Sequence, residues 1–589
     1  MLPLIPGTTP PTPYYSRDGV LCDCVGVEGF DEVLCYAWQG DNYGPAGVNE
    51  TIATFDVFRA HFPNATRIIA STPDAWFKRI DANASLRASL PVIDQEIGDT
   101  WIYGAASDPL KLAMMRAMMR ARAACVAAEE PNLADFTRLL LKLPEHTWGG
   151  CGCAHMDLAM PTVAFTAIDL AAARANRSTN RDPFYTVMET TWDEQRSFIA
   201  AALSALDDTP TIAASTAAAP SKSALGTALR AELAALQAPP PSASSAAAAG
   251  YTAVPRTRWS ETFTLGNFIV GLDLTSGALT TLTDTRSGLE WASAARPALR
   301  FAYRTHAYHE AVTYKRAYGY AHGGEFPYPA AGSASAFSWP WAGMNRSATV
   351  AQAWYGRVVG LWRRSEKSAN VTTAKSSASS SSSALVELAL PVSKDALRGK
   401  YGAPATVWLN LTAAAPTNTL GGSAAAALSP RKLSVELVWE NKRATRLLES
   451  IWLEMRPRLP SASEHTWRTI LDKLGSRVDA ARVVPNGGGA LHGIDPHGGV
   501  TLEARGADPL NFTVTSRDAG IVAPGASGLG LSPINFTAPP PSGASDGFAW
   551  LLFTNLYEVN YPMWYPWKSE DASSRFRFEM KVEGGGNVK

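Results

Sequence analysis

A change in hydrophobic period close to residue 250 constrains this chain more than any other feature of its sequence. Upstream, apolar residues recur at helical spacing, as in Trp192, Ile199 and Leu203. Downstream, apolar and polar residues alternate with a period of two, as from Phe268 to Leu274. Helices and strands bury different faces, so we expect the two halves of the chain to form different architectures.

The length of the chain predicts more than one domain. Its 589 residues exceed the size at which a single hydrophobic core keeps growing. A segment rich in Pro, Ser and Ala predicts a linker that cannot fold alone. We therefore expect a multidomain α/β and β protein. Its predicted parts are the C-terminal part of a β/α barrel in residues 1–105, a helical bundle in 106–237, the linker in 238–250, and one or two large antiparallel β-sandwiches in 251–589.

Strands and helices alternate near the N-terminus. The segments 33–38 and 66–70 have the pattern of short apolar strands, and 48–61 between them has the pattern of a helix. This order predicts parallel pairing, as in a β/α barrel. A whole barrel needs about 250 residues. Since the first 15 residues also lack the pattern of a signal peptide, we expect that the natural start of the protein lies upstream of Met1.

The predicted bundle begins with a clear helix signal. Asp108 suits the N-cap and Pro109 suits the first helical position of a helix over 110–129. Further helices are predicted over 133–143, 162–175 and 188–206. In the β region, the polar tracts 376–383 and 421–429 predict disordered loop insertions.

Charge and modification signals narrow the class of partner and the compartment. Lys plus Arg and Asp plus Glu are equal at 53 each, so no global field attracts nucleic acid. No run of about 18 apolar residues predicts a membrane span. Nine Asn-x-Ser/Thr sequons and six cysteines in the first 153 residues predict a secreted or lumenal glycoprotein with disulfides, in pairings that the sequence leaves open.

A first candidate site follows the apolar strand that ends at Trp38. Asp41 and Asn42 come directly after it, where the C-terminal ends of barrel strands form an active-site mouth. Asp41 is thus a candidate general acid, and Trp38 and Asn42 are candidates for substrate binding. The alternative is an Asp-Asn-x-Gly turn selected for its backbone geometry.

Two further segments combine carboxylates with aromatic rings. Glu96, Asp99 and Trp101 lie in one, and Glu145 and Trp148 flank His146 in the other. Carboxylates accept hydrogen bonds from sugar hydroxyls and a ring packs on the apolar sugar face, so these residues are candidates for substrate binding. His146 is a candidate metal ligand. A solvated loop, and a histidine that favours a helix C-terminus, are the alternatives.

In their order along the chain, these segments resemble glycoside hydrolase family 38, the zinc-dependent retaining alpha-mannosidases. They resemble more closely a related family, domain of unknown function 5054. The segment 40–45, Gly-Asp-Asn-Tyr-Gly-Pro, is similar to a loop of the mannosidases, and Glu145-His146-Thr147-Trp148-Gly149 stands where they carry a zinc motif. Segments 96–101, 107–109, 192–196, 491–493, 555–564 and 575–578 are similar to the related family.

The resemblance implies roles for two of these residues. Asp41 would be the acid/base and His146 a zinc ligand, with zinc holding adjacent sugar hydroxyls. The family's other zinc ligands and its aspartate nucleophile have no counterpart before Asp41. The chain is therefore predicted to be an incomplete alpha-mannosidase-like glycoside hydrolase acting on carbohydrate. The alternative is a non-catalytic secreted protein that binds carbohydrate or serves a structural role.

Overall fold

The computed structural model describes most of the chain, in two compact units. The units are Met1–Asp94 and Gln95–Lys589, and each is described here by itself. The described residues are 21–38, 46–93, 95, 101–129, 133–144, 163–175, 183–206, 222–310, 344, 349–365, 381–414, 431–460, 466–483, 491–505, 510–525, 546–555 and 564–584.

The N-terminal unit is a β-hairpin with three helices. Strands β1 (Leu21–Gly26) and β2 (Val33–Trp38) pair antiparallel, and a disulfide joins the directly opposed Cys24 and Cys35. Helices α1 (Val48–His61), α2 (Pro73–Ala82) and α3 (Ala84–Ser89) follow. A small core of Val27, Trp76, Ile80 and Leu86 holds this unit together.

The hairpin corrects the prediction of parallel pairing between the segments 33–38 and 66–70. The helix over 48–61 is confirmed, but 66–70 has no strand pairing, and no parallel pair occurs among the described strands. The strand β2 instead takes its partner from the segment just before it, across a turn in which Gly29 has a φ of +80°. Glycine adopts that left-handed conformation at little cost, so the local hairpin forms.

A layer of helices opens the second unit. The predicted helix after Asp108 is confirmed: the Asp108 carboxylate accepts a hydrogen bond from the Lys111 backbone N–H at 3.0 Å. The elements are η1 (Trp101–Ser107), α4 (Pro109–Ala127), α5 (Ala134–Leu140), α7 (Ala167–Ala175), α8 (Pro183–Ser204), α9 (Lys222–Leu236) and α10 (Ala243–Ala248). None of the helices in the described ranges is long and apolar enough to cross a bilayer.

The helix α10 lies inside the predicted linker, so that segment is folded. Ser242 caps it in a capping box with Ser245, and Ala246 is buried against Leu385 and Trp408. Its composition predicted disorder because it carries few large apolar groups, but the sheet beneath supplies the missing surface. Likewise, residues 381–383 of the predicted serine-rich loop begin strand β10.

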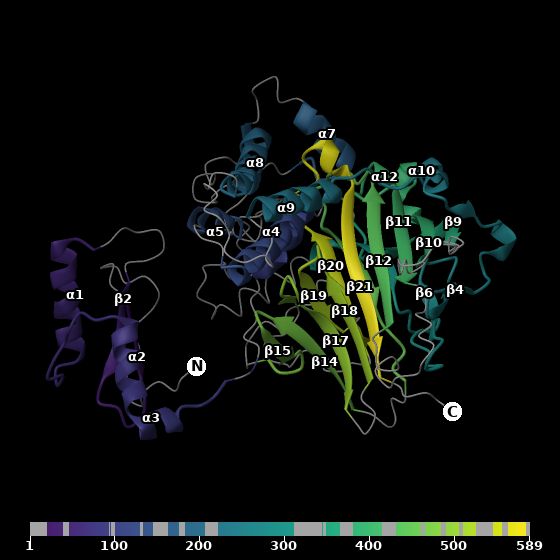
Figure 1. Ribbon diagram of the computed structural model, residues 1–589. Coiled ribbons are helices and arrows are strands. Elements are labelled where there is room, and N and C mark those ends of the chain that lie inside the picture. The colour runs from purple at the N-terminus through teal and green to yellow at the C-terminus, as the bar shows by residue number, and fades with distance from the viewer. Residues whose placement is uncertain are drawn as a thin grey trace. The chain divides into compact units, whose positions relative to one another are not determined.

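The rest of the unit is built of antiparallel sheets (Figure 1). The largest has ten strands in the order β15-β14-β17-β18-β21-β12-β11-β10-β9-β3. Their bounds are β3 Thr252–Ala253, β9 Arg357–Ser365, β10 Ser381–Ala389, β11 Thr406–Ala414, β12 Arg431–Glu440, β14 Thr466–Lys473, β15 Ser476–Asp479, β17 Gly499–Arg505, β18 Leu510–Ser516 and β21 Ser574–Glu583.

Two smaller sheets pack with it. One has six strands, in the order β16 (His492–Gly493), β19 (Ile521–Pro524), β20 (Phe548–Thr554), β13 (Glu449–Met455), β7 (Arg300–Thr305) and β8 (Gln352–Tyr355). The other has three strands, in the order β4 (Phe263–Leu265), β5 (Phe268–Leu272) and β6 (Leu279–Asp284). Contacts such as that of Trp550 with Phe578, with ring centroids 5.8 Å apart, join the large sheets in one core. The predicted antiparallel pairing of the strands in the β region is thus confirmed.

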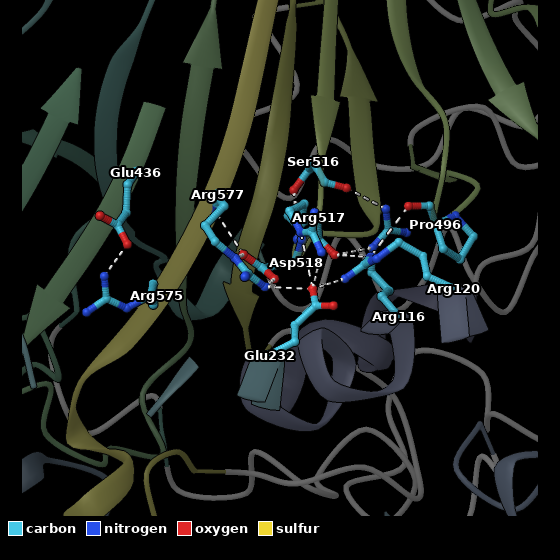
Figure 2. Close-up of polar contacts among 11 residues, drawn as sticks. Arg116, Arg120, Glu232, Glu436, Pro496, Ser516, Arg517, Asp518, Arg575 and Arg577 are labelled. Carbon is cyan, nitrogen blue, oxygen red and sulfur yellow. Dashed lines mark hydrogen bonds and ion pairs between the residues drawn. The ribbon is translucent and has the colours of Figure 1, made fainter. Parts of the chain in front are cut away.

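Arginines on α4 attach the helical layer to the ten-stranded sheet (Figure 2). Arg116 is 3% exposed, and its guanidinium donates to the backbone oxygens of Ile494 at 2.6 Å and Ser516 at 2.8 Å, with longer contacts to Asp495 and Arg517. Burial, and then the nearby charge of Arg120, lower the pKa of Arg116 to about 10. The guanidinium therefore satisfies carbonyl groups that burial would otherwise leave without donors.

Glu232 of α9 completes this contact. Its Oε1 accepts from Arg120 at 2.7 Å, from Arg517 at 2.7 Å and from Arg577 at 3.2 Å (Figure 2). Burial acts to raise the pKa of Glu232, but the hydrogen bonds and charges of Arg517 and Arg120 outweigh it and lower that pKa. One carboxylate thereby joins α4, α9 and the strand β21.

Replacing Arg116 by Met is expected to destabilise the second unit. The four carbonyls that it contacts would lose a buried donor, which should cost about 3 kcal/mol or more in the free energy of unfolding. Urea unfolding of the full chain measures this, with Arg138→Met on the exposed face of α5 as the control. Equal stability of the two variants would contradict the role given to Arg116.

Candidate functional site

The residues predicted from the sequence to form the site lie almost entirely outside the described part of the chain. This applies to Asp41, Asn42, Glu96, Asp99, Glu145, His146 and Trp148. Trp38 ends β2 and Trp101 begins η1, and only their backbone positions are described. Their roles in catalysis, in sugar binding and, for His146, in zinc binding remain predictions. In the described ranges, no group of three or more His, Cys, Asp or Glu side chains is arranged to hold a metal ion.

A pocket lies at one edge of the ten-stranded sheet, and we call it the edge pocket. It has a volume of about 460 Å³. Its walls come from the segment between α10 and β4, from β4 itself, from the end of β9 and from the start of β10. The lining residues are Gly250, Thr252, Ala253, Val254, Pro255, Arg258, Glu261, Thr262, Phe263, Thr264, Leu265, Leu361, Arg363, Arg364 and Ser382.

Local backbone features set the wall that follows α10. Gly250, with a φ of +81°, ends the helix, and the two residues of β3 then pair with β9. Pro255 precedes the short helix η3 (Arg256–Arg258), and the Trp259 indole N–H donates to the Val254 oxygen at 2.8 Å. These contacts hold Arg258 at the mouth of the pocket.

The opposite wall depends on the tight β4–β5 hairpin. Gly266, with a φ of +54°, approaches the Ala414 oxygen so closely that a Cβ would lie 2.3 Å from it. Its backbone N–H donates to the Ser382 hydroxyl oxygen at 2.9 Å. Because Ser382 accepts this bond, its own O–H can donate to a ligand in the pocket.

The charge of the edge pocket is positive. Arg258, Arg363 and Arg364 line it with a single carboxylate, that of Glu261, which pairs with Arg258 at 2.9 Å. The Arg363 guanidinium lies over the Phe263 ring, 4.8 Å from its centroid. Burial, and then the charge of Arg258, lower the pKa of Arg363.

Sequence reasoning missed this pocket. The segment Trp362-Arg363-Arg364 places two consecutive arginines in a strand, which was a usable signal because one of them must face the inner side of the sheet. The other walls come from residues about a hundred positions earlier in the chain, so no local pattern could join them.

A second polar cluster involves Ser450, His306 and Glu310. His306 Nε2 lies 3.0 Å from the Ser450 hydroxyl oxygen, and its Nδ1 lies 3.6 Å from Glu310 Oε2. This order of groups occurs in nucleophilic sites. However, Ser450 is 0% exposed, and its hydroxyl oxygen also accepts from the Trp452 indole N–H at 2.8 Å. The cluster therefore joins the end of β7 to β13 and has a structural role.

Comparisons with known proteins give one family and several distant structural likenesses. The family model described as domain of unknown function (DUF5054) matches residues 105–420, more than half of the chain. No curated protein matches.

Two of the structural likenesses are to galactose mutarotase relatives. A galactose mutarotase-like protein from Clostridium acetobutylicum is 7% identical, with 57% of this chain and 98% of that chain covered and a TM-score of 0.25. A galactose mutarotase related enzyme from Lactobacillus acidophilus is 9% identical, with 56% and 99% covered and a TM-score of 0.21. At these TM-scores the likenesses carry no conclusion about activity.

The buried His306 cluster predicts a stability that falls in mild acid. Burial, the dominant cause, lowers the pKa of His306 below the ordinary value of 6.5, so the unfolded chain binds the proton first as pH falls below about 6.5. Burial acts to raise the pKa of Glu310, but its bonds with His306 and the Ala307 N–H lower that pKa to about 2. Glu310 therefore stays ionised in the folded protein between pH 7 and 5.

Urea unfolding at pH 7 and pH 5 measures this effect. His306→Gln is expected to lose less stability between the two values than the natural chain does, by up to about 1.4 kcal/mol for each pH unit. His497→Gln, at an exposed turn, is the control. An unchanged pH dependence in His306→Gln would show that His306 does not titrate as described.

Proposed function

This chain belongs to the family described as domain of unknown function 5054, and on that premise we propose that it is a carbohydrate-binding protein that holds a saccharide in the edge pocket. The pocket lies wholly within the residues that match the family model. The candidate residues Trp38, Asp41, Asn42, Glu96, Asp99 and Trp101 lie before that region. A function common to the family is therefore better sought in the pocket than near Asp41.

The observation that carries this proposal is the combination of size and lining in the edge pocket. Its volume of about 460 Å³ falls in the range of roughly 300–1,000 Å³ that is usual for sites of small ligands. Thr252, Thr262 and Thr264 are exposed in its lining, and so are the apolar residues Ala253 and Pro255. Sugars require hydrogen-bonding groups for their hydroxyls and an apolar surface for their C–H faces.

A glycoside hydrolase is our second proposal, and the segment 40–45 favours it by its resemblance to a loop of the alpha-mannosidases. In that case Asp41 would protonate the leaving oxygen, and His146 would be one ligand of a zinc ion. A retaining mechanism requires a second carboxylate about 5 Å from the first. The activity would therefore also require this carboxylate and the other zinc ligands.

Filling the edge pocket is expected to abolish saccharide binding. In Ala253→Trp, an indole replaces an exposed methyl group that lines the pocket, and affinity for the oligosaccharides bound by the natural chain should fall at least tenfold. A glycan array of neutral and acidic oligosaccharides identifies those ligands, and titration calorimetry measures their affinity. Ala248→Trp, on the exposed end of α10 outside the lining, is the matched control. Binding that survives in Ala253→Trp would exclude the pocket.

We also propose that the protein passes through the secretory route, which predicts a pattern of glycosylation. Asn49 and Asn64 are exposed and should carry glycans. Asn410 lies partly buried within β11 and accepts a hydrogen bond from the Tyr251 hydroxyl at 3.0 Å, so it should remain unmodified. Peptide mass spectrometry after glycan release in heavy water, on secreted protein from eukaryotic cells, distinguishes these sites. Modification of Asn410 in the folded protein would contradict its described position.

A further inference from the structure

The edge pocket carries more positive charge than a neutral sugar requires. Arg258, Arg363 and Glu261 are among its lining residues, and the glutamate is already paired with Arg258, so the charge of Arg363 remains. We propose that the pocket selects saccharides that carry an anionic group, either the carboxylate of a uronic acid or a sulfate ester. This inference rests on the saccharide-binding function proposed above and names the class of saccharide.

Arg363 is the residue expected to contact the anion. It is only partly exposed, lies on β9 and reaches over the Phe263 ring. Across the described ranges, no carboxylate lies within ion-pair distance of its guanidinium. Burial, and then the charge of Arg258, another cation of the pocket, disfavour the charged state of Arg363. A half-buried cation beside a like charge is costly unless an anion compensates it.

The geometry of the guanidinium fits this role. Its planar group of N–H donors can bind two oxygens of a carboxylate or sulfate at once. The ring of Phe263 beneath it restricts its motion, which lowers the entropy lost on binding. The hydroxyls of Thr264 and Ser382 on the other walls can then bind the neutral part of the sugar.

Three matched oligosaccharides test the preference by titration calorimetry on the full chain. The probes are a tetrasaccharide of alternating N-acetylglucosamine and glucuronic acid, its carboxyl-reduced neutral counterpart, and the neutral counterpart bearing sulfate esters. Binding of an acidic probe at least tenfold tighter than the neutral one supports the proposal. The acidic probe that binds more tightly, uronate or sulfated, identifies the anion that the pocket prefers.

The variant Arg363→Gln tests the residue. It should remove the tenfold preference for the acidic probe and leave the affinity for the neutral probe within about twofold, because only the charged contact is lost. Arg357→Gln, on the same strand but outside the pocket lining, should keep the preference. In the natural chain, raising the salt concentration from 0.1 to 0.5 M should weaken the binding of the acidic probe and leave the binding of the neutral probe unchanged.

The outcomes separate this inference from the proposed function. Equal affinity for the neutral and acidic probes would overturn the anionic preference and leave saccharide binding intact. A preference that persists in Arg363→Gln and is insensitive to salt would also overturn it. If none of the three probes binds and no glycan on the array binds, both the inference and the proposed saccharide-binding function are wrong.

Discussion

In the second unit, the packing of the helices on the sheets depends on the contacts of the Arg196 guanidinium. It pairs with the Asp108 carboxylate at 2.7 Å and with Asp571, and it lies 4.0 Å from the centroid of the Trp567 ring. Asp108 also caps α4, so one buried arginine links the start of α4, the middle of α8 and the segment before β21. Removing Arg196 would leave the Asp108 and Asp571 carboxylates buried without this partner.

Aromatic packing around Arg196 also holds α8 against the sheets. Trp192 of α8 contacts Trp564, with ring centroids 4.5 Å apart, and the Trp564 indole N–H donates to Glu189 at 3.0 Å. Polar and apolar contacts thus fix α8 against the sandwich along several turns. The edge pocket forms elsewhere in this unit, where the two-residue strand β3 ends the ten-stranded sheet. So short an edge strand also offers little backbone for pairing with another chain.

Sequence patterns predicted local elements well and their partners poorly. The helices α1 and α4 were predicted with nearly their observed bounds, because caps such as Asp108 and apolar spacing act within a few residues. The parallel pairing predicted for β2 was wrong, since the choice of partner depends on the whole unit. The segment 238–250 was predicted to be a linker because its own residues cannot form a core, yet α10 folds on a surface supplied by β10 and β11.

The sequence by itself determined the family, the division into helical and β regions, and the antiparallel pairing in the β region. Each of these depends on local composition and on the hydrophobic period along the chain. Only the tertiary structure decided where the cations of the edge pocket meet. Arg258 and Arg363 lie about a hundred residues apart, and β3 and β9 must pair before both can line one cavity. Such a site depends on contacts between distant segments, which no periodicity along the chain encodes.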